Sequence, residues 1–283
     1  MQPVNKTRHL KVFFCVGSQK SGTTLLARIL DQHPEVACIC ESYGFRPNSS
    51  ASIFNPASAK WRRHGFSEAD VQQWSQVWNA QPRVRFRTAL NRLNENNILT
   101  QSCFRETMSM VFADFARRCG ATIVGDKWPG YIRYLNSILS VFEEARIIYT
   151  IRDPRGLWNS AQRFKGRQRG DDLLQVMLQN DDRIRPFLKR KNFLTIRFED
   201  LVTDSKKTIQ RLYKFLDCNN FSASLRYETE LDPYPDRWYW VPEASEPVDS
   251  MHASKWKHML SLDETKRIDN LAFDFMKRYG YEF

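Results

Sequence analysis

The sequence predicts an α/β protein whose central parallel sheet is flanked by helices on both sides. Two short apolar runs, Val12–Val16 and Val36–Ile39, have the length of buried strands. Between them a helical pattern of apolar residues begins at Thr23 and stops at His33-Pro34. A strand, a helix and a strand in this order predict a parallel sheet, because the helix carries the chain back to the end of the sheet where the first strand began.

The rest of the chain continues this alternation. Further buried strands are expected at Ala121–Gly125, Arg146–Ile151 and Phe193–Phe198. Helices are expected at Phe104–Cys119, at Tyr131–Phe142, after Asp153-Pro154 through Ala161, and at Ser205–Leu216. Ser261 followed by Glu264 has the pattern of a capping box and predicts the start of a closing helix that ends near Tyr279-Gly280.

Length and composition favour a single domain over residues 1–283, larger than usual and elaborated by loops. Hydrophobic residues make up 42% of the chain and charged residues 27%, which supplies a packed core and gives no signature of disorder. Residues 43–97 are irregular, and we interpret them as a helical, loop-rich insertion. Asp232–Pro247 is interpreted as a long loop.

The formal net charge of +11 predicts an anionic partner, because a positive potential concentrates negative ligands. Lys and Arg are spread along the chain and form neither a tail nor a single stripe, so the charge gives no specific support to nucleic-acid binding. A nucleotide together with an acidic acceptor explains the charge equally well. We expect no nucleic acid among the partners.

The six cysteines have neither the spacing of a zinc site nor that of a disulfide framework, and they are typical of reduced thiols in the cytoplasm. The apolar stretch Leu10–Gly17 is too short for a signal sequence or a membrane span. We therefore expect a cytoplasmic protein that does not associate with a membrane. The alternative is a lumenal enzyme from which an N-terminal anchor has been removed.

The loop after the first strand has the composition of an anion site. Gly17–Thr24 lies between a buried strand and a helix, where successive backbone N–H groups and the helix N-terminus attract a phosphate, so the fold is expected to be P-loop-like and three-layered. A loop for nucleoside triphosphates would carry a lysine where Thr23 stands. Here the positive charge is at Lys20, inside the loop. Such a loop can bind one phosphate and place an ammonium beside a leaving oxygen, and no metal ion is then needed. The other interpretation is a glycine turn with a solvated lysine.

Lys20–Thr24 resembles the 5′-phosphosulfate loop of sulfotransferases that use 3′-phosphoadenosine-5′-phosphosulfate (PAPS). The next segment, Leu25–Val36, ends in Leu-Asp-x-His-Pro-Glu-Val and is similar to the protein-tyrosine sulfotransferase branch and its bacterial relatives. The resemblance implies sulfuryl transfer from PAPS to an acceptor hydroxyl with no metal. It also implies that PAPS is bound by Ser18, Gln19, Lys20, Ser21, Gly22, Thr23 and Thr24.

A second motif of this family is an Arg at a strand end and a Ser eight residues later, which bind the 3′-phosphate. Arg152 and Ser160 have this spacing. A strand end can direct the guanidinium at the phosphate, while the following helix presents the hydroxyl on the same side. Taken alone, Arg-Asp-Pro after a strand is also a common turn. Together with the first loop, and in the family's order, the pair supports a nucleotide site.

Alignment of His33-Pro34-Glu35-Val36 with the tyrosyl-protein branch places Glu41 at the position of the proposed general base. A carboxylate at the carboxyl end of a strand can take a proton from a hydroxyl nucleophile. Lys127 corresponds by resemblance to a lysine that steadies the sulfuryl oxygens, and a cation there would offset developing charge. The resemblance thus implies Lys20, Glu41 and Lys127 as catalytic residues. A solvated carboxylate and an exposed loop lysine are the alternatives for Glu41 and Lys127.

The segment Ser254–Lys257 resembles a late family loop that closes over the cosubstrate. The resemblance implies that Trp256 stacks on adenine and that Lys255 or Lys257 reaches the 3′-phosphate, although Trp256 also fits a core position. Thr195–Leu201 resembles another family segment, for which we expect a structural role as a strand and its turn.

The acceptor is expected to lie against the insertion, on a surface that suits an acidic peptide or an anionic carbohydrate. Its arginines and tryptophans are Arg46, Arg62, Arg63, Arg83, Arg85, Arg87, Arg92, Trp61, Trp74 and Trp78. Peptide tyrosine, carbohydrate and small-molecule alcohols all remain open as acceptors. Two other functions stay open as well: a nucleotide kinase, and a module that binds the nucleotide without catalysis.

Overall fold

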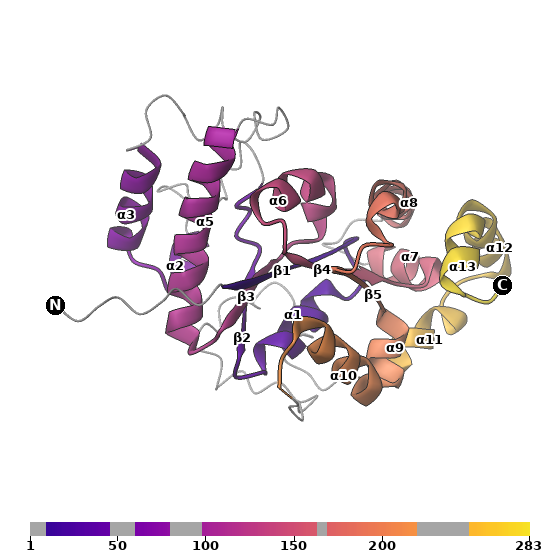
Figure 1. Cartoon of the computed structure of the whole chain (residues 1–283). Coiled ribbons are helices and arrows are strands. Elements are labelled where there is room, and N and C mark those ends of the chain that lie inside the picture. The colour runs from indigo at the N-terminus through magenta and orange to yellow at the C-terminus, as the bar shows by residue number, and fades with distance from the viewer. Residues whose placement is uncertain (1–9, 46–59, 80–97, 163–168, 220–248) are drawn as a thin grey trace.

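The structure of the chain is a computed structural model that describes residues 10–45, 60–79, 98–162, 169–219 and 249–283. Its centre is a five-stranded sheet in the order β2-β3-β1-β4-β5, and every neighbouring pair is parallel (Figure 1). The strands are β1 (Lys11–Gly17), β2 (Val36–Cys40), β3 (Ile123–Lys127), β4 (Arg146–Ile151) and β5 (Phe193–Arg197). The predicted α/β fold with a central parallel sheet is confirmed.

Helices cover both faces of the sheet and make it the middle of three layers (Figure 1). One layer contains α1 (Thr23–Asp31), α9 (Phe198–Thr203) and α10 (Ser205–Leu216). The other contains α5 (Ile98–Cys119), α6 (Leu135–Val141), α7 (Pro154–Gln162), α8 (Gly170–Ile184), α12 (Leu262–Leu271) and α13 (Phe273–Tyr279). The short helices α2 (Lys60–Arg63) and α3 (Glu68–Asn79) lie beside α5, and α11 (Met251–Ser254) contacts α7 and α9.

Alternating residues of each strand build the two cores, because successive side chains of a strand point to opposite faces. Phe14 contributes to the core beneath α5, where its ring lies 5.9 Å from that of Phe112. Phe13 and Cys15 contribute to the opposite core with α1 and α10. Burial on both faces explains why these strands are continuous apolar runs in the sequence.

Several predicted elements are confirmed within a residue or two, among them α1, β4 and α10. The capping box is also present, since Ser261 Oγ accepts a hydrogen bond from the Glu264 amide and the Glu264 carboxylate accepts one from the Ser261 amide. The closing helix, however, is interrupted at Ala272 and forms α12 and α13. The predicted strand at Phe193–Phe198 ends one residue early, because Phe198 begins α9.

The third strand differs from the prediction in a way that matters for the site. It was expected at Ala121–Gly125 but runs over Ile123–Lys127. Ala121 is still part of the helix terminus, where its N–H donates to the Ala116 carbonyl after the left-handed Gly120. Lys127 is consequently the last residue of a buried strand and not part of an exposed loop.

Much of the predicted insertion and of the predicted Asp232–Pro247 loop lies outside the described residues. This holds for Arg46, Arg83, Arg85, Arg87 and Arg92, and for the side chains of Arg63, Trp74 and Trp78. Of the insertion's aromatic residues, Trp61 is buried in the core, and the Arg62 guanidinium lies 4.8 Å from its ring centre. Within the described ranges, every helix is too short or too polar to cross a lipid bilayer.

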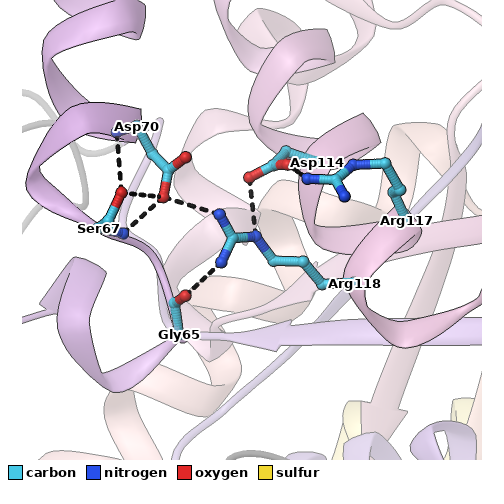
Figure 2. Close-up of polar contacts among 6 residues, drawn as sticks. All are labelled: Gly65, Ser67, Asp70, Asp114, Arg117 and Arg118. Atoms are coloured by element: carbon cyan, nitrogen blue, oxygen red, sulfur yellow. Dashed lines mark hydrogen bonds and ion pairs between the residues drawn. The ribbon is translucent and has the colours of Figure 1, made fainter.

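Arg118 joins the described part of the insertion to α5 (Figure 2). Its guanidinium donates to Asp114 at 2.9 Å, to Asp70 at 2.7 Å and to the Gly65 carbonyl at 2.5 Å. Asp70 in turn accepts hydrogen bonds from the amide and hydroxyl of Ser67, at the start of α3. One partly buried arginine therefore fixes the N-terminus of α3 against the long helix α5.

Replacing Arg118 with Ala should lower the free energy of unfolding by about 2–3 kcal/mol, because two carboxylates and a carbonyl lose a charged donor. Urea denaturation measures the change. The matched control is Arg117→Ala, since Arg117 is on the same helix, is 72% exposed and pairs only with Asp114 among the described residues. An equal effect of the two substitutions would contradict the role given to Arg118.

Candidate active site

The carboxyl ends of the five parallel strands meet along one edge of the sheet, and every catalytic residue predicted from the sequence follows or ends a strand there. The loop that contains Lys20 follows the central strand β1. Glu41 follows β2, Lys127 ends β3 and Arg152 follows β4. The fold therefore gathers at one edge residues that are more than one hundred positions apart in sequence.

The loop between β1 and α1 is a tight turn held by its own serines. The amide and the hydroxyl of Ser21 both donate to the Ser18 carbonyl, at 3.2 and 2.7 Å. Lys20 and Gly22 have left-handed backbones, with φ of 67° and 91°. Thr23 then starts α1 and Thr24 lies in its first turn, so the loop ends at a helix N-terminus that favours anions.

Gly22 is required at its position for two reasons. Its φ of 91° is a conformation that residues with a Cβ atom rarely adopt, and a Cβ atom there would lie 2.5 Å from the Phe198 ring. Phe198, the first residue of α9, also carries the Arg152 guanidinium 4.2 Å above its ring centre. The phenyl ring thus packs against both the loop and the arginine that follows β4.

Lys127 is the most deeply buried cation of the site, with 1% of its side chain exposed. Its Nζ donates to Glu41 Oε1 at 3.1 Å and to Thr24 Oγ1 at 3.3 Å. Burial opposes the charged form, but the neighbouring Cys40 and Glu41 outweigh it and raise the pKa of Lys127 above its ordinary value. The ammonium therefore stays charged and contacts both the candidate base and the first turn after the loop.

Glu41 is held in a conformation that directs its carboxylate toward Lys127. Its φ is 64°, and its amide donates to the Lys127 carbonyl at 2.8 Å. The second carboxylate oxygen accepts a hydrogen bond from the Tyr43 hydroxyl at 2.8 Å, and Tyr43 is also left-handed, with φ 56°. Such conformations are unfavourable for residues other than glycine and cluster at functional sites.

Asp126 fixes the turn that carries Glu41. It is fully buried and accepts hydrogen bonds from the amide and hydroxyl of Ser42 and from the hydroxyl of Tyr131. Burial raises the pKa of Asp126 to about 6, although these hydrogen bonds favour its charged form. Ser42 lies between Glu41 and Tyr43, so a buried carboxylate at the end of β3 anchors both left-handed residues.

Arg152 connects the loop with segments from the far end of the chain. Its guanidinium donates to the Lys20 carbonyl and to the His252 carbonyl, each at 3.0 Å. Burial lowers the pKa of Arg152, an effect that the carboxylates of Glu199 and Asp153 oppose. Its Nε is buried without a hydrogen-bond partner among the described residues. Ser160, half-buried on α7, is the residue expected to act with it.

The late loop forms a 3₁₀ helix at Lys255–His258, in which Trp256 is buried and Lys255 and Lys257 are exposed. The Arg155 guanidinium covers the Trp256 ring at 4.0 Å from its centre. Trp256 therefore packs on an arginine of α7, as a core residue would. Its predicted stacking on adenine, and the predicted contacts of the two lysines with a phosphate, stay predictions.

Sequence reasoning missed two residues that contact the loop or its surroundings. Phe198 was interpreted as the end of a strand, and the support that it gives to Gly22 and Arg152 has no local signal. Asn180, buried on α8, donates to Ser18 Oγ at 3.3 Å. The apolar spacing of Leu173, Leu174 and Met177 indicates a helix, but nothing in that pattern indicates the contact.

At the opposite edge of the sheet, His33, Glu35 and Cys218 offer ligand atoms within 4.8 Å of one another. They do not form a good metal site, because both ring nitrogens of His33 are already hydrogen-bonded. Nδ1 accepts from the Glu35 amide and Nε2 contacts the Asn219 carbonyl, each at 3.0 Å. The cluster holds the residues that follow α10 against the start of β2.

A family model described as the sulfotransferase family matches residues 13–222. Over 287 residues the chain is 22% identical to a Caenorhabditis briggsae protein named "Putative protein-tyrosine sulfotransferase", a match that covers 96% of this chain and 89% of that protein.

Solved structures resemble this fold over nearly the whole chain. The sulfotransferase domain from the curacin biosynthetic pathway has a TM-score of 0.62 at 18% identity, and the match covers 96% of this chain and 98% of that one. The sulfotransferase domain of the Synechococcus PCC 7002 olefin synthase gives 0.59 at 18% identity, over 100% and 98%. A mouse sulfotransferase in complex with PAP gives 0.52 at 12% identity, over 94% and 85%. At these identities the likeness establishes the fold.

The buried Asp126 should change protein stability with pH. Because its pKa is about 6 in the folded protein and about 3.8 in the unfolded chain, the folded state holds the proton more tightly. Its contribution is fully present below about pH 4 and is lost as the pH rises through about 6. We expect the free energy of unfolding of the wild type, minus that of Asp126→Asn, to fall by about 2–3 kcal/mol from about pH 4 to about pH 7 in urea denaturation. A difference that does not vary with pH would show an ordinary carboxyl group at this position.

Proposed function

The chain belongs to the sulfotransferase family, and we propose that it transfers a sulfuryl group from PAPS to an acceptor hydroxyl. PAPS would supply an activated sulfuryl group attached to a phosphate. The observation that carries this proposal is the position of Lys127, whose Nζ contacts both Thr24, at the end of the phosphate loop, and Glu41, the candidate base.

Two features of the chain fit a nucleotide with phosphates at two points. The loop Ser18–Gly22 ends at a helix N-terminus and carries the ammonium of Lys20. Arg152 lies beside that loop and has a buried Nε without a partner among the described residues, and Ser160 is on the next helix. We propose that the loop residues Ser18–Thr24 bind the 5′-phosphosulfate and that Arg152 and Ser160 bind the 3′-phosphate.

Glu41 would act as the general base. Its carboxylate, held by Lys127 at 3.1 Å, can accept the proton of an acceptor hydroxyl. The left-handed backbone at Glu41 and the hydrogen bonds from its own amide and from Tyr43 fix the direction of that carboxylate. A base held in this way loses little freedom when the acceptor arrives.

Lys127 and Lys20 would stabilise the negative charge that develops during transfer. Lys127 is nearly inaccessible to water, so its charge acts through a medium of low polarity and has a larger effect than in solution. Its contacts with Glu41 and Thr24 keep it in place before the reaction begins, which avoids a reorganisation cost. Lys20 would contribute the second positive charge, within the loop.

The acceptor is proposed to be a hydroxyl of a peptide tyrosine, a carbohydrate or a small alcohol. The name of the Caenorhabditis relative supports the first of these. The net charge of +11 supports an acceptor in an acidic peptide or an anionic carbohydrate. A location in the cytoplasm is proposed with it, on the basis of the cysteine pattern.

Transfer of radioactive sulfate from labelled PAPS tests the proposal. The assay offers an acidic tyrosine peptide, a sulfate-free glycan and a phenol in parallel, without added metal ion. Label in any acceptor supports the proposal and identifies the acceptor class. Binding of PAPS without label in any acceptor would instead favour a nucleotide-binding module, and magnesium-dependent phosphate transfer from ATP would favour a kinase.

Glu41→Gln should lower the rate of sulfuryl transfer by about 10²–10⁴-fold, because the amide cannot accept the proton at neutral pH. Binding of the nucleotide should change little, since the amide keeps the size of the side chain. Single-turnover assays at saturating PAPS measure the rate. The control is Glu144→Gln, an exposed position that precedes the start of β4, whereas the site lies at the carboxyl ends of the strands. Wild-type rates in Glu41→Gln would reject Glu41 as the base.

A further inference from the structure

The turn that follows β4 is held by Glu199, which is distant in sequence, and by Arg155, which is two residues further along the chain. Asp153, next to Arg152, donates its amide to Glu199 Oε1 at 2.9 Å. Its carboxylate accepts two hydrogen bonds from the Arg155 guanidinium, at 2.9 and 2.8 Å. Glu199 therefore fixes the backbone of Asp153, directly after Arg152, and Arg155 fixes the Asp153 side chain.

The last residues of the chain hold both of these supports. The Tyr281 hydroxyl donates to Glu199 Oε2 at 2.9 Å. The Glu199 carboxylate therefore joins the Tyr281 hydroxyl, at one oxygen, to the Asp153 amide, at the other. Tyr281 is buried, and the Arg197 guanidinium lies 4.2 Å above its ring centre. Arg155 in turn donates to the Glu282 carbonyl at 2.7 Å.

The two connections have different chemistry but reach the same turn. One runs from Tyr281 through Glu199 to the Asp153 amide. The other runs from the Glu282 carbonyl through Arg155, which is 7% exposed, to the Asp153 carboxylate. A cation and an anion that are both buried need such complete pairing, because an unpaired buried charge is costly. The conformation of the turn and the position of the C-terminus are therefore interdependent.

We propose that Tyr281 and Glu282 position Arg152 for the 3′-phosphate of the nucleotide, so that binding of this phosphate depends on these two residues. The inference rests on the proposed function in one respect, the assignment of Arg152 to that phosphate. Tyr281 and Glu282 are positioning residues, since they act through Glu199 and Arg155.

Loss of the Tyr281 hydroxyl would leave one oxygen of Glu199 without a donor. Burial already raises the pKa of Glu199, and the hydrogen bond from Tyr281 opposes this rise. Without it, one of the two contacts that hold the Glu199 carboxylate is lost, so the carboxylate is less firmly oriented toward the Asp153 amide and toward Arg152. The ring itself would stay, because its packing against Phe275 and Arg197 does not use the hydroxyl.

The test compares Tyr281→Phe with the matched control Tyr279→Phe. Tyr279 is two residues earlier and donates its hydroxyl to another buried carboxylate, that of Asp181, at 2.6 Å. Calorimetry measures the affinities of adenosine 3′,5′-bisphosphate (PAP) and of adenosine 5′-monophosphate, which lacks the 3′-phosphate. Hydrogen exchange measures the protection of the Asp153 amide in the same proteins.

We expect Tyr281→Phe to weaken PAP binding about tenfold, or about 1.4 kcal/mol, with little change for the monophosphate and with faster exchange of the Asp153 amide. In the transfer assay the KM for PAPS should rise, while kcat and the KM for the acceptor stay near wild type. Tyr279→Phe should lower thermal stability and leave all these values unchanged.

Equal effects of the two substitutions, or an unchanged affinity for PAP in Tyr281→Phe, would overturn the inference and leave the proposed function standing. If the wild type binds no PAP, the proposed function fails instead. The exchange rate of the Asp153 amide then still decides whether Tyr281 holds the turn: faster exchange in Tyr281→Phe supports the connection, and unchanged exchange overturns it.

Discussion

The structure depends on one constraint, that all five strands are parallel and so end along the same edge of the sheet. The central strand β1 delivers the loop Ser18–Gly22 to the middle of that edge, and its neighbours β3 and β4 deliver Lys127 and Arg152 on either side. The helices that return the chain cover both faces and bury most of β1 to β4, while the edge strand β5 is partly buried. A site assembled from several strand ends therefore follows from the topology, as is usual for open parallel sheets.

At this edge of the sheet, the buried charged side chains are held by ion-pair or hydrogen-bond partners. Lys127 can remain an ammonium although it is almost fully buried, because Glu41 is 3.1 Å away. Asp126, one residue earlier, is buried among hydroxyl groups and holds the turn that carries Glu41. The two consecutive residues of β3 thus support the candidate base from opposite faces of the strand, one as its ion-pair partner and the other through its backbone.

The sequence was sufficient to predict the parallel sheet and the loop between its first strand and first helix, because buried parallel strands are continuous apolar runs and the loop has a local pattern. It was not sufficient for contacts between distant segments. Asn180 reaches Ser18 from a helix that no motif indicated, and Phe198 supports Gly22 from a position interpreted as a strand. The third strand was predicted two residues early, because apolar spacing alone does not show where the helix terminus at Gly120 ends.

The central claim is that the loop after β1, with an ammonium at Lys20 and a hydroxyl at Thr23, binds a sulfated nucleotide and not a triphosphate. Titration calorimetry of the wild-type chain tests it most directly, with PAP in one experiment and magnesium ATP in another at the same concentrations. We predict saturable binding of PAP and no measurable binding of magnesium ATP. Tight binding of magnesium ATP together with no binding of PAP would contradict it.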